Sequence, residues 1–153
     1  LSYDCTIQKE RKFICVGRYF VGSHSKNQKN ILDAFFQSEY ASMNYKLVFM
    51  GSLSNDIYDI AYYNDLLESS NESIIIKCNV NRSELISEYN KATFAISATG
   101  YGIDESKYPE KLEHFGMSTL EAAIHGCIPI VYHLGGPAGA NTSYKSIDEH
   151  EHW

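Results

Sequence analysis

Two glutamates and two glycines mark one short stretch in the last third of the chain. Glu113 precedes Gly116, which opens a helical pattern that carries Glu121 and stops at Gly126. The first-turn amides of such a helix are unpaired and partly positive, so they suit a phosphate. Gly116 lets a ligand approach the backbone, which a Cβ would obstruct. The pattern predicts a diphosphate on the amides and sugar hydroxyls on Glu121, although an ordinary glycine-to-helix junction with a solvated glutamate has the same local pattern.

Two cations lie in the first part of the chain, where they could complete an anion site. Arg18 follows Gly17 and the apolar run at residues 12–16, so its guanidinium is expected at the carboxyl end of a buried strand. Lys26 lies in the loop-like segment that leads into the next helical pattern. Both positions suit contacts to an anion. The alternative is that both residues are ordinary surface charges.

The elements that must position these residues alternate along the chain. Apolar, β-favouring runs predict strands, and apolar positions at helical spacing predict helices. A long loop at residues 98–112 leads directly into Glu113, and long loops in compact α/β domains are more often functional than accidental. The predicted strands cover residues 12–16, 46–51, 73–78, 93–97 and 128–132, and the predicted helices cover residues 30–36, 56–68, 81–91 and the segment that ends before Gly126.

This alternation predicts an α/β fold, a Rossmann-like parallel sheet with right-handed crossovers and helices on both faces. In such sheets, ligands bind at the carboxyl ends of the strands, where the strand order reverses. The loops after the first, fourth and fifth strands all lie at that edge. We therefore expect the two candidate clusters to meet there.

Composition limits the possible functions further. The chain has 153 residues, 44% of them hydrophobic and 21% charged, as expected for one globular domain. The net charge of −6 disfavours a nonspecific nucleic-acid-binding surface. The four cysteines show no C-x-x-C spacing, so we expect reduced thiols, no metal site and a cytoplasmic location. No apolar run reaches the length needed to span a bilayer.

The spacing of the glutamates resembles a known family. Glu113 and Glu121 are separated by seven residues, and Gly126, Pro129 and the Gly-Gly pair at residues 135–136 follow in order. This series resembles the E-x7-E element of the retaining glycosyltransferases of family 4, the group 1 glycosyltransferases, which have the GT-B fold. The resemblance covers roughly residues 12–137.

The first cluster is similar to a second element of that family, V-G-R followed by K-G and a helix. Lys26 lies eight residues before Ala34, as in the family, but three extra residues separate it from Arg18 and Asn27 replaces the usual glycine. After Pro137 the family has an acidic residue that opens a helix, whereas residues 138–141 are Ala-Gly-Ala-Asn. The longer loop leaves open whether Lys26 reaches the position that it has in the family. The altered residues after Pro137 leave open whether the site is complete.

The resemblance implies a role for each site residue. It assigns catalytic roles to Arg18 and Lys26, which would stabilise the leaving nucleoside diphosphate without a metal, and to Glu113, which would contact the transferred sugar. It assigns Glu121 to the ribose hydroxyls. No D-x-D sequence occurs, so no metal or other cofactor is expected beside the nucleoside-diphosphate sugar. The donor-binding residues that the resemblance implies are Gly17, His114, Phe115, Gly116, Met117, Ser118 and Glu121.

By this resemblance the chain is the donor-binding, C-terminal half of a retaining glycosyltransferase of glycan biosynthesis. The chain starts with Leu1, so we expect one domain over residues 1–153 of a longer two-domain enzyme, with a leader at residues 1–11 and an irregular tail at residues 138–153. A glycan or lipid-linked acceptor would bind through the N-terminal domain, the isolated domain would be inactive, and the full-length enzyme could lie at the inner membrane face.

Three alternatives from other classes stay open. A related GT-B enzyme such as a sugar-nucleotide epimerase would share the fold and the anion site. A noncatalytic nucleotide-binding domain with a decayed site would fit the altered segment after Pro137. A hydrolase with paired carboxylates is the weakest of the three, because nothing near Glu113 and Glu121 supplies an acid and a nucleophile on opposing walls.

Overall fold

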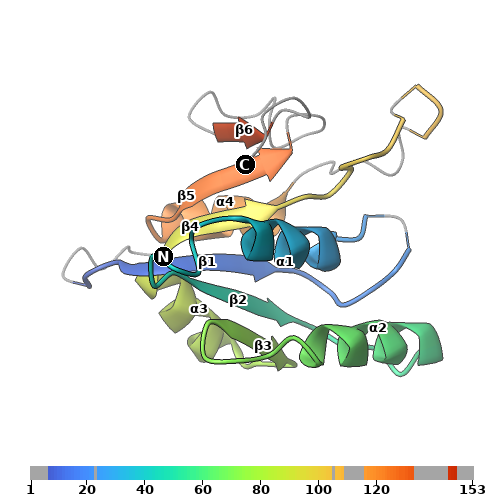
Figure 1. The fold of residues 1–153 in the computed structure, drawn as a ribbon, viewed down its shortest axis with the longest axis horizontal. Coiled ribbons are helices and arrows are strands. Elements are labelled where there is room, and N and C mark those ends of the chain that lie inside the picture. Colours follow the sequence, from blue (N-terminus) through green and yellow to red (C-terminus); the bar gives the residue numbers. More distant parts are fainter. Residues whose placement is uncertain (1–6, 23, 105, 109–115, 133–144, 148–153) are drawn as a thin grey trace.

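The chain forms a six-stranded, all-parallel sheet in the order β3-β2-β1-β4-β5-β6 (Figure 1). The computed structural model describes residues 7–22, 24–104, 106–108, 116–132 and 145–147. Apolar runs form the central strands, as expected for parallel strands that are covered on both faces. The strands are β1 (Glu10–Val16), β2 (Lys46–Gly51), β3 (Ile74–Cys78), β4 (Ala92–Ser97), β5 (Ile128–Tyr132) and β6 (Lys145–Ile147).

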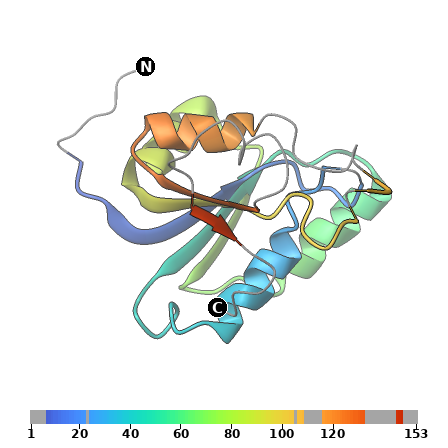
Figure 2. The same cartoon turned by 90° about the horizontal axis from the view of Figure 1, so that it is seen from above.

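Helices cover both faces of the sheet, α1 and α2 on one face and α3 and α4 on the other (Figure 2). Successive residues of a strand point to opposite faces. Phe13 and Cys15 of β1 therefore pack in the core beneath α1 and α2, whereas Ile14 packs with residues of α3 and α4. In the part of the chain that the structure describes, no helix has the length and apolar character that a membrane crossing requires. The helices are α1 (Gln28–Gln37), α2 (Ile57–Leu67), α3 (Arg82–Lys91) and α4 (Met117–Ile124).

The helices begin in two different ways. The Asp56 side chain caps α2 by accepting backbone N–H bonds at 2.8 and 3.3 Å, and Asn81 caps α3 by accepting one at 2.9 Å. In contrast, α1 and α4 follow residues in the left-handed conformation, Asn27 (φ 51°) and Gly116 (φ 60°), and neither has a side-chain cap bond. The cluster with Arg18 and Lys26 precedes α1, and the cluster with Gly116 precedes α4, so both candidate clusters lie at the start of a helix without a side-chain cap.

The strand order reverses between β1 and β4. The chain builds β1, β2 and β3 outward in one direction and then returns to place β4 on the other side of β1. The helix of a parallel βαβ unit runs back across the sheet, so α1, α3 and α4 begin at the edge where the strands end (Figure 1). This edge is the place where ligands bind in sheets of this type.

The predicted fold class is confirmed, and all five predicted strands are present. Two boundaries differ. Strand β1 begins at Glu10, inside the segment predicted as a leader, because Glu10 pairs with Ala92 of β4. Strand β6 lies inside the segment predicted as an irregular tail. Its sequence, Lys-Ser-Ile, is no apolar run, and it is defined by backbone pairing to the edge of β5.

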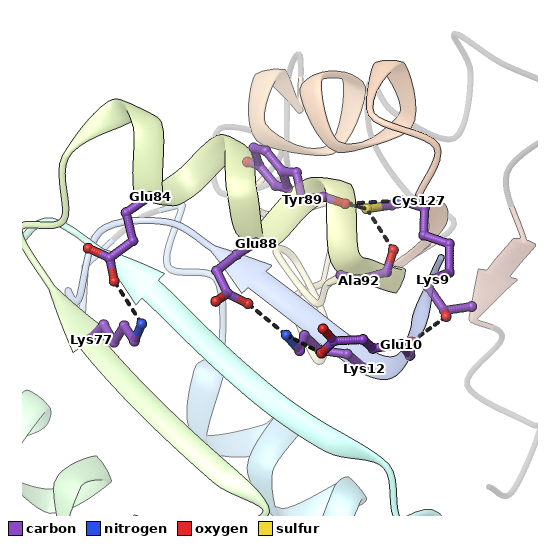
Figure 3. Close-up of polar contacts among 10 residues, drawn as sticks. Lys9, Glu10, Lys12, Lys77, Glu84, Glu88, Tyr89, Ala92 and Cys127 are labelled. Atoms are coloured by element: carbon purple, nitrogen blue, oxygen red, sulfur yellow. Dashed lines mark hydrogen bonds and ion pairs between the residues drawn. The ribbon is translucent and has the colours of Figure 1, made fainter. Parts of the chain in front are cut away.

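A buried lysine ties β1 to α3. Lys12 is 5% exposed, and its Nζ lies 2.7 Å from Glu10 Oε2 and 2.8 Å from Glu88 Oε2 of α3 (Figure 3). A buried charge needs such partners, since an unpaired one would destabilise the fold. This ion-pair group joins α3 to the sheet through Glu88.

Candidate functional site

Gly17 brings the two predicted cations together at the end of β1. A Cβ on Gly17 would lie 2.3 Å from Cγ of Lys26, so the lysine side chain lies directly against the residue before Arg18. The loop between the cations is three residues longer than in the pattern it resembles, yet it returns Lys26 to the strand end. A side chain at position 17 would force the Lys26 side chain to move, so the glycine allows this contact.

Arg18 is exposed and is held by an aromatic ring. Its Cζ lies 4.2 Å from the centroid of the Phe20 ring, a cation–π distance. Among the residues that the structure describes, no carboxylate forms an ion pair with Arg18. The predicted anion-binding residue therefore has donors that can contact a phosphate.

Asn27 and Gln28 fix the loop that carries Lys26, and the sequence analysis assigned neither of them to the site. Asn27 Nδ2 donates to the Ala98 carbonyl at 2.7 Å, which joins the loop to the end of β4. The left-handed backbone at Asn27 explains why asparagine can replace the glycine of the resembled pattern, since both residues adopt this conformation readily. Gln28 is buried and donates from Nε2 to the Arg18 carbonyl at 3.1 Å.

The start of α4 carries the second cluster. Gly116 has φ 60° and its carbonyl accepts from the backbone N–H of Thr119 at 2.9 Å, so the helix begins directly after the glycine. Met117 is exposed and Ser118 is half-buried in the first turn. These predicted residues thus lie on one helix start at the carboxyl edge. Glu113, His114 and Phe115 fall outside the described residues, so their roles stay predictions.

Glu121 lies in the second turn of α4 and forms an ion pair with a residue that the sequence analysis did not single out. Arg82, the first residue of α3, donates from Nη2 to Oε1 of Glu121. The glutamate side chain is 23% exposed and the arginine side chain 57%. Thirty-nine positions separate the two residues, so no local pattern could have paired them. The two residues meet because α3 and α4 pack on the same face of the sheet (Figure 2).

A pocket of about 260 Å³ opens beside Arg18 at the carboxyl ends of three adjacent strands. Its walls are mostly apolar, and the approach of β1 to β2 there depends on Gly51, because a Cβ at that position would lie 1.9 Å from the Gly17 carbonyl oxygen. The turn that follows β3 forms one wall and leads directly into Arg82. The lining residues are Val16, Gly17, Arg18, Met50, Gly51, Ser52, Asn79, Val80 and Leu85.

The cysteines behave as small apolar residues. Burial raises the pKa of Cys15 to about 12, although the charge of Lys26 opposes the shift, so this thiol stays protonated. Cys15, Cys78 and Cys127 all carry free thiols. Within the described ranges, no group of three or more His, Cys, Asp or Glu side chains is arranged to hold a metal ion. The expectation that the site uses no metal stays a prediction.

Comparisons with known proteins give one consistent result. A sequence profile described as glycosyl transferases group 1 matches residues 6–150. The fold is similar to AviGT4, a glycosyltransferase involved in avilamycin A biosynthesis, with a TM-score of 0.59 and 15% identity over 90% of this chain. It is also similar to the GtfA/B complex, with a TM-score of 0.62 and 16% identity over 99% of this chain. The match spans 38% of the AviGT4 chain and 27% of the GtfA/B chain. No curated protein sequence matches significantly.

Proposed function

Because the chain belongs to the glycosyl transferases group 1 family, we propose that it forms the donor-binding part of an enzyme that transfers a sugar from a nucleoside-diphosphate sugar to an acceptor. One observation carries the proposal. Gly17 packs Lys26 beside Arg18 at the end of β1, next to the point where the strand order reverses. Two cations at that edge suit the diphosphate of a sugar nucleotide.

The diphosphate would bind between these cations and the first turn of α4. Met117 and Ser118 lie in the first turn after Gly116, where backbone N–H groups have no partner within the helix and no side chain caps them. A group 1 enzyme of this kind needs positive charge where the leaving diphosphate becomes more negative, and Arg18 and Lys26 can supply it. Glu113 would contact the transferred sugar from the segment before the helix.

The nucleoside would extend from the diphosphate into the pocket beside Arg18. The apolar side chains of Val16, Met50 and Val80 line this pocket, and its volume of about 260 Å³ can hold a planar base. Gly51, which also lines the pocket, allows the Gly17 carbonyl to lie close to the end of β2. The ribose would then lie toward α4, where the Glu121 carboxylate can accept bonds from its hydroxyls.

We propose that the transfer reaction also needs a second domain. The structural relatives are two to four times longer, so a second domain is proposed to supply the acceptor site, which would take a glycan or a lipid-linked sugar. We propose retention at the anomeric carbon, a cytoplasmic location and no metal requirement. This domain alone would bind the donor and transfer nothing.

Thermal unfolding in the presence of nucleotides tests the proposal. UDP, GDP and ADP are each titrated to millimolar concentration, and at least one should raise the melting temperature, because a ligand that binds only the folded state stabilises it. EDTA should leave this shift unchanged. If all three nucleotides leave the melting temperature where it is, the chain has no donor site of its own and the proposal is wrong.

A further inference from the structure

We propose that Arg82 is a positioning residue for the ribose-binding carboxylate of Glu121, and that ribose recognition therefore depends on α3 as well as on α4. The inference rests on the proposed function of the site. It starts from the ion pair between Arg82 Nη2 and Glu121 Oε1, which joins the first residue of α3 to the second turn of α4.

Arg82 lies between the pocket beside Arg18, where we propose that the base binds, and Glu121, where we propose that the ribose binds. Asn79 and Val80, in the turn that precedes α3, line the pocket. Arg82 follows this turn directly and pairs with Glu121, the residue proposed to bind ribose. A nucleoside that fills the pocket and reaches Glu121 must therefore pass beside the ion pair. Any shift of the α3 start would move the pocket wall and the carboxylate partner together.

The geometry of the pair favours positioning over blocking. Arg82 bonds to Oε1 of Glu121, and a carboxylate has two oxygens with several acceptor sites, so Oε2 keeps its capacity for ribose hydroxyls. The hydroxyl of buried Tyr89 donates to the Ser118 carbonyl at 3.2 Å, which fixes α3 against α4. This bond helps to place the first residue of α3 beside the second turn of α4, where the guanidinium and the carboxylate meet.

The positive charge of Arg82 should also favour binding of the diphosphate. An ionised carboxylate close to a diphosphate repels it, and a neighbouring guanidinium offsets that repulsion. The Arg82 and Glu121 side chains are partly exposed, and exposed ion pairs contribute little to the free energy of unfolding. We therefore do not expect this pair to stabilise the fold much. Its effect should therefore appear in ligand binding and not in the melting temperature.

The test measures how much the ribose hydroxyls contribute to binding in each variant. Dissociation constants are measured by calorimetry for UDP, GDP and ADP and for their 2′,3′-dideoxy analogues, which have the same charge and base but no hydroxyls. The ratio of the two constants isolates the hydroxyls from long-range charge effects. The variants are R82A, R82K, E121Q and the double variant. K77A is the matched control, since Lys77 also pairs with a first-turn glutamate of α3, Glu84, at 2.7 Å (Figure 3).

The wild type should bind the ribonucleotide roughly tenfold or more tightly than its dideoxy analogue, because a hydrogen bond to a charged group contributes about this much to affinity. R82A and E121Q should each reduce this preference to within about threefold, and the double variant should add nothing to E121Q. R82K should keep part of the preference, and K77A all of it. Each folded variant should unfold at close to the wild-type temperature.

Two results would overturn the inference while leaving the donor site intact. In the first, R82A still prefers the ribonucleotide over its dideoxy analogue as the wild type does, while E121Q has lost this preference. That result would mean that Arg82 plays no part in ribose binding. A larger preference in R82A would mean that Arg82 competes with ribose for the carboxylate. If the wild type binds none of the nucleotides, the proposed function fails first, and the inference fails with it.

Discussion

Lys26 packs against Gly17, the residue that precedes Arg18. A Cβ at position 17 would overlap Cγ of Lys26, so the glycine lets the lysine cross the end of β1. The Cζ atom of Arg18 lies 4.2 Å from the centroid of the Phe20 ring, and no carboxylate among the described residues forms an ion pair with Arg18. The sequence allows both cations to be ordinary surface charges; the structure places Lys26 against Gly17, and the roles of both cations stay predictions.

Replacing Arg18 with alanine should weaken nucleoside-diphosphate binding by roughly tenfold to a hundredfold, the range for charge-assisted hydrogen bonds. The free energy of unfolding should change little, because the side chain is exposed and fills no core position. Calorimetry gives the affinity and chemical denaturation gives the stability. Arg11, which is also exposed and donates to a backbone carbonyl at 3.0 Å, offers R11A as a control with wild-type affinity. Intact affinity with lost stability would make Arg18 a structural residue.

The elements show which parts of the molecule a sequence can predict. Strands β1 to β5 were found because apolar, β-favouring runs are local patterns. Strand β6 was missed because Lys-Ser-Ile carries no such pattern. The pocket was missed because Ser52 and Asn79, in the loops after β2 and β3, are ordinary loop residues whose meeting depends on strand order. The Arg82–Glu121 pair was missed for the same reason, since it exists only between two helices packed on one face.

The start of α1 allows a test at the scale of the element. Asn27→Gly keeps a residue that favours the left-handed backbone but removes the bond to the Ala98 carbonyl, so it should lower the free energy of unfolding by about 1 kcal/mol. Asn27→Ala loses the same bond and adds strain of about 1 kcal/mol at φ 51°, so it should be the less stable variant. Chemical denaturation of both variants measures the order. Equal stability of the two variants would show that the backbone at position 27 relaxes without strain.

In the molecule as a whole, the proposed ligand site and a polar cluster lie at opposite edges of the sheet. Where the strands begin, the Tyr89 carbonyl accepts from Lys9 Nζ at 3.0 Å and from Cys127 Sγ at 3.2 Å (Figure 3). Lys9 Nζ also donates to the His125 carbonyl at 2.7 Å. These bonds join the segment before β1 to the ends of α3 and α4. Substitutions there should act on folding, whereas substitutions at the other edge should act on binding.

His125 makes this cluster sensitive to acid. The residue is 2% exposed, its ring stacks on Tyr89 with centroids 5.8 Å apart, and Nδ1 lies 2.8 Å from Asn90 Oδ1. With Nδ1 donating to that oxygen, the proton of the charged form must go to Nε2, a buried atom for which the structure describes no hydrogen-bond partner. Burial lowers the pKa of His125; Glu121 favours the charged form, and Arg82 and Lys9 disfavour it.

The sign of the pH effect follows from proton binding. The unfolded chain takes up this proton near the ordinary histidine value of 6.5, and the folded chain takes it up only at a lower pH. Between these values the unfolded state binds more protons, so stability should fall as the pH drops below 6.5. His125→Gln removes the titrating ring, so its free energy of unfolding should decline less over the same range, even if its stability at pH 8 is lower. Chemical denaturation of both proteins at several pH values between 8 and 5 gives the two slopes. Parallel declines would assign the acid sensitivity to other groups and would mean that the folded chain accepts a proton on His125 as readily as the unfolded chain does.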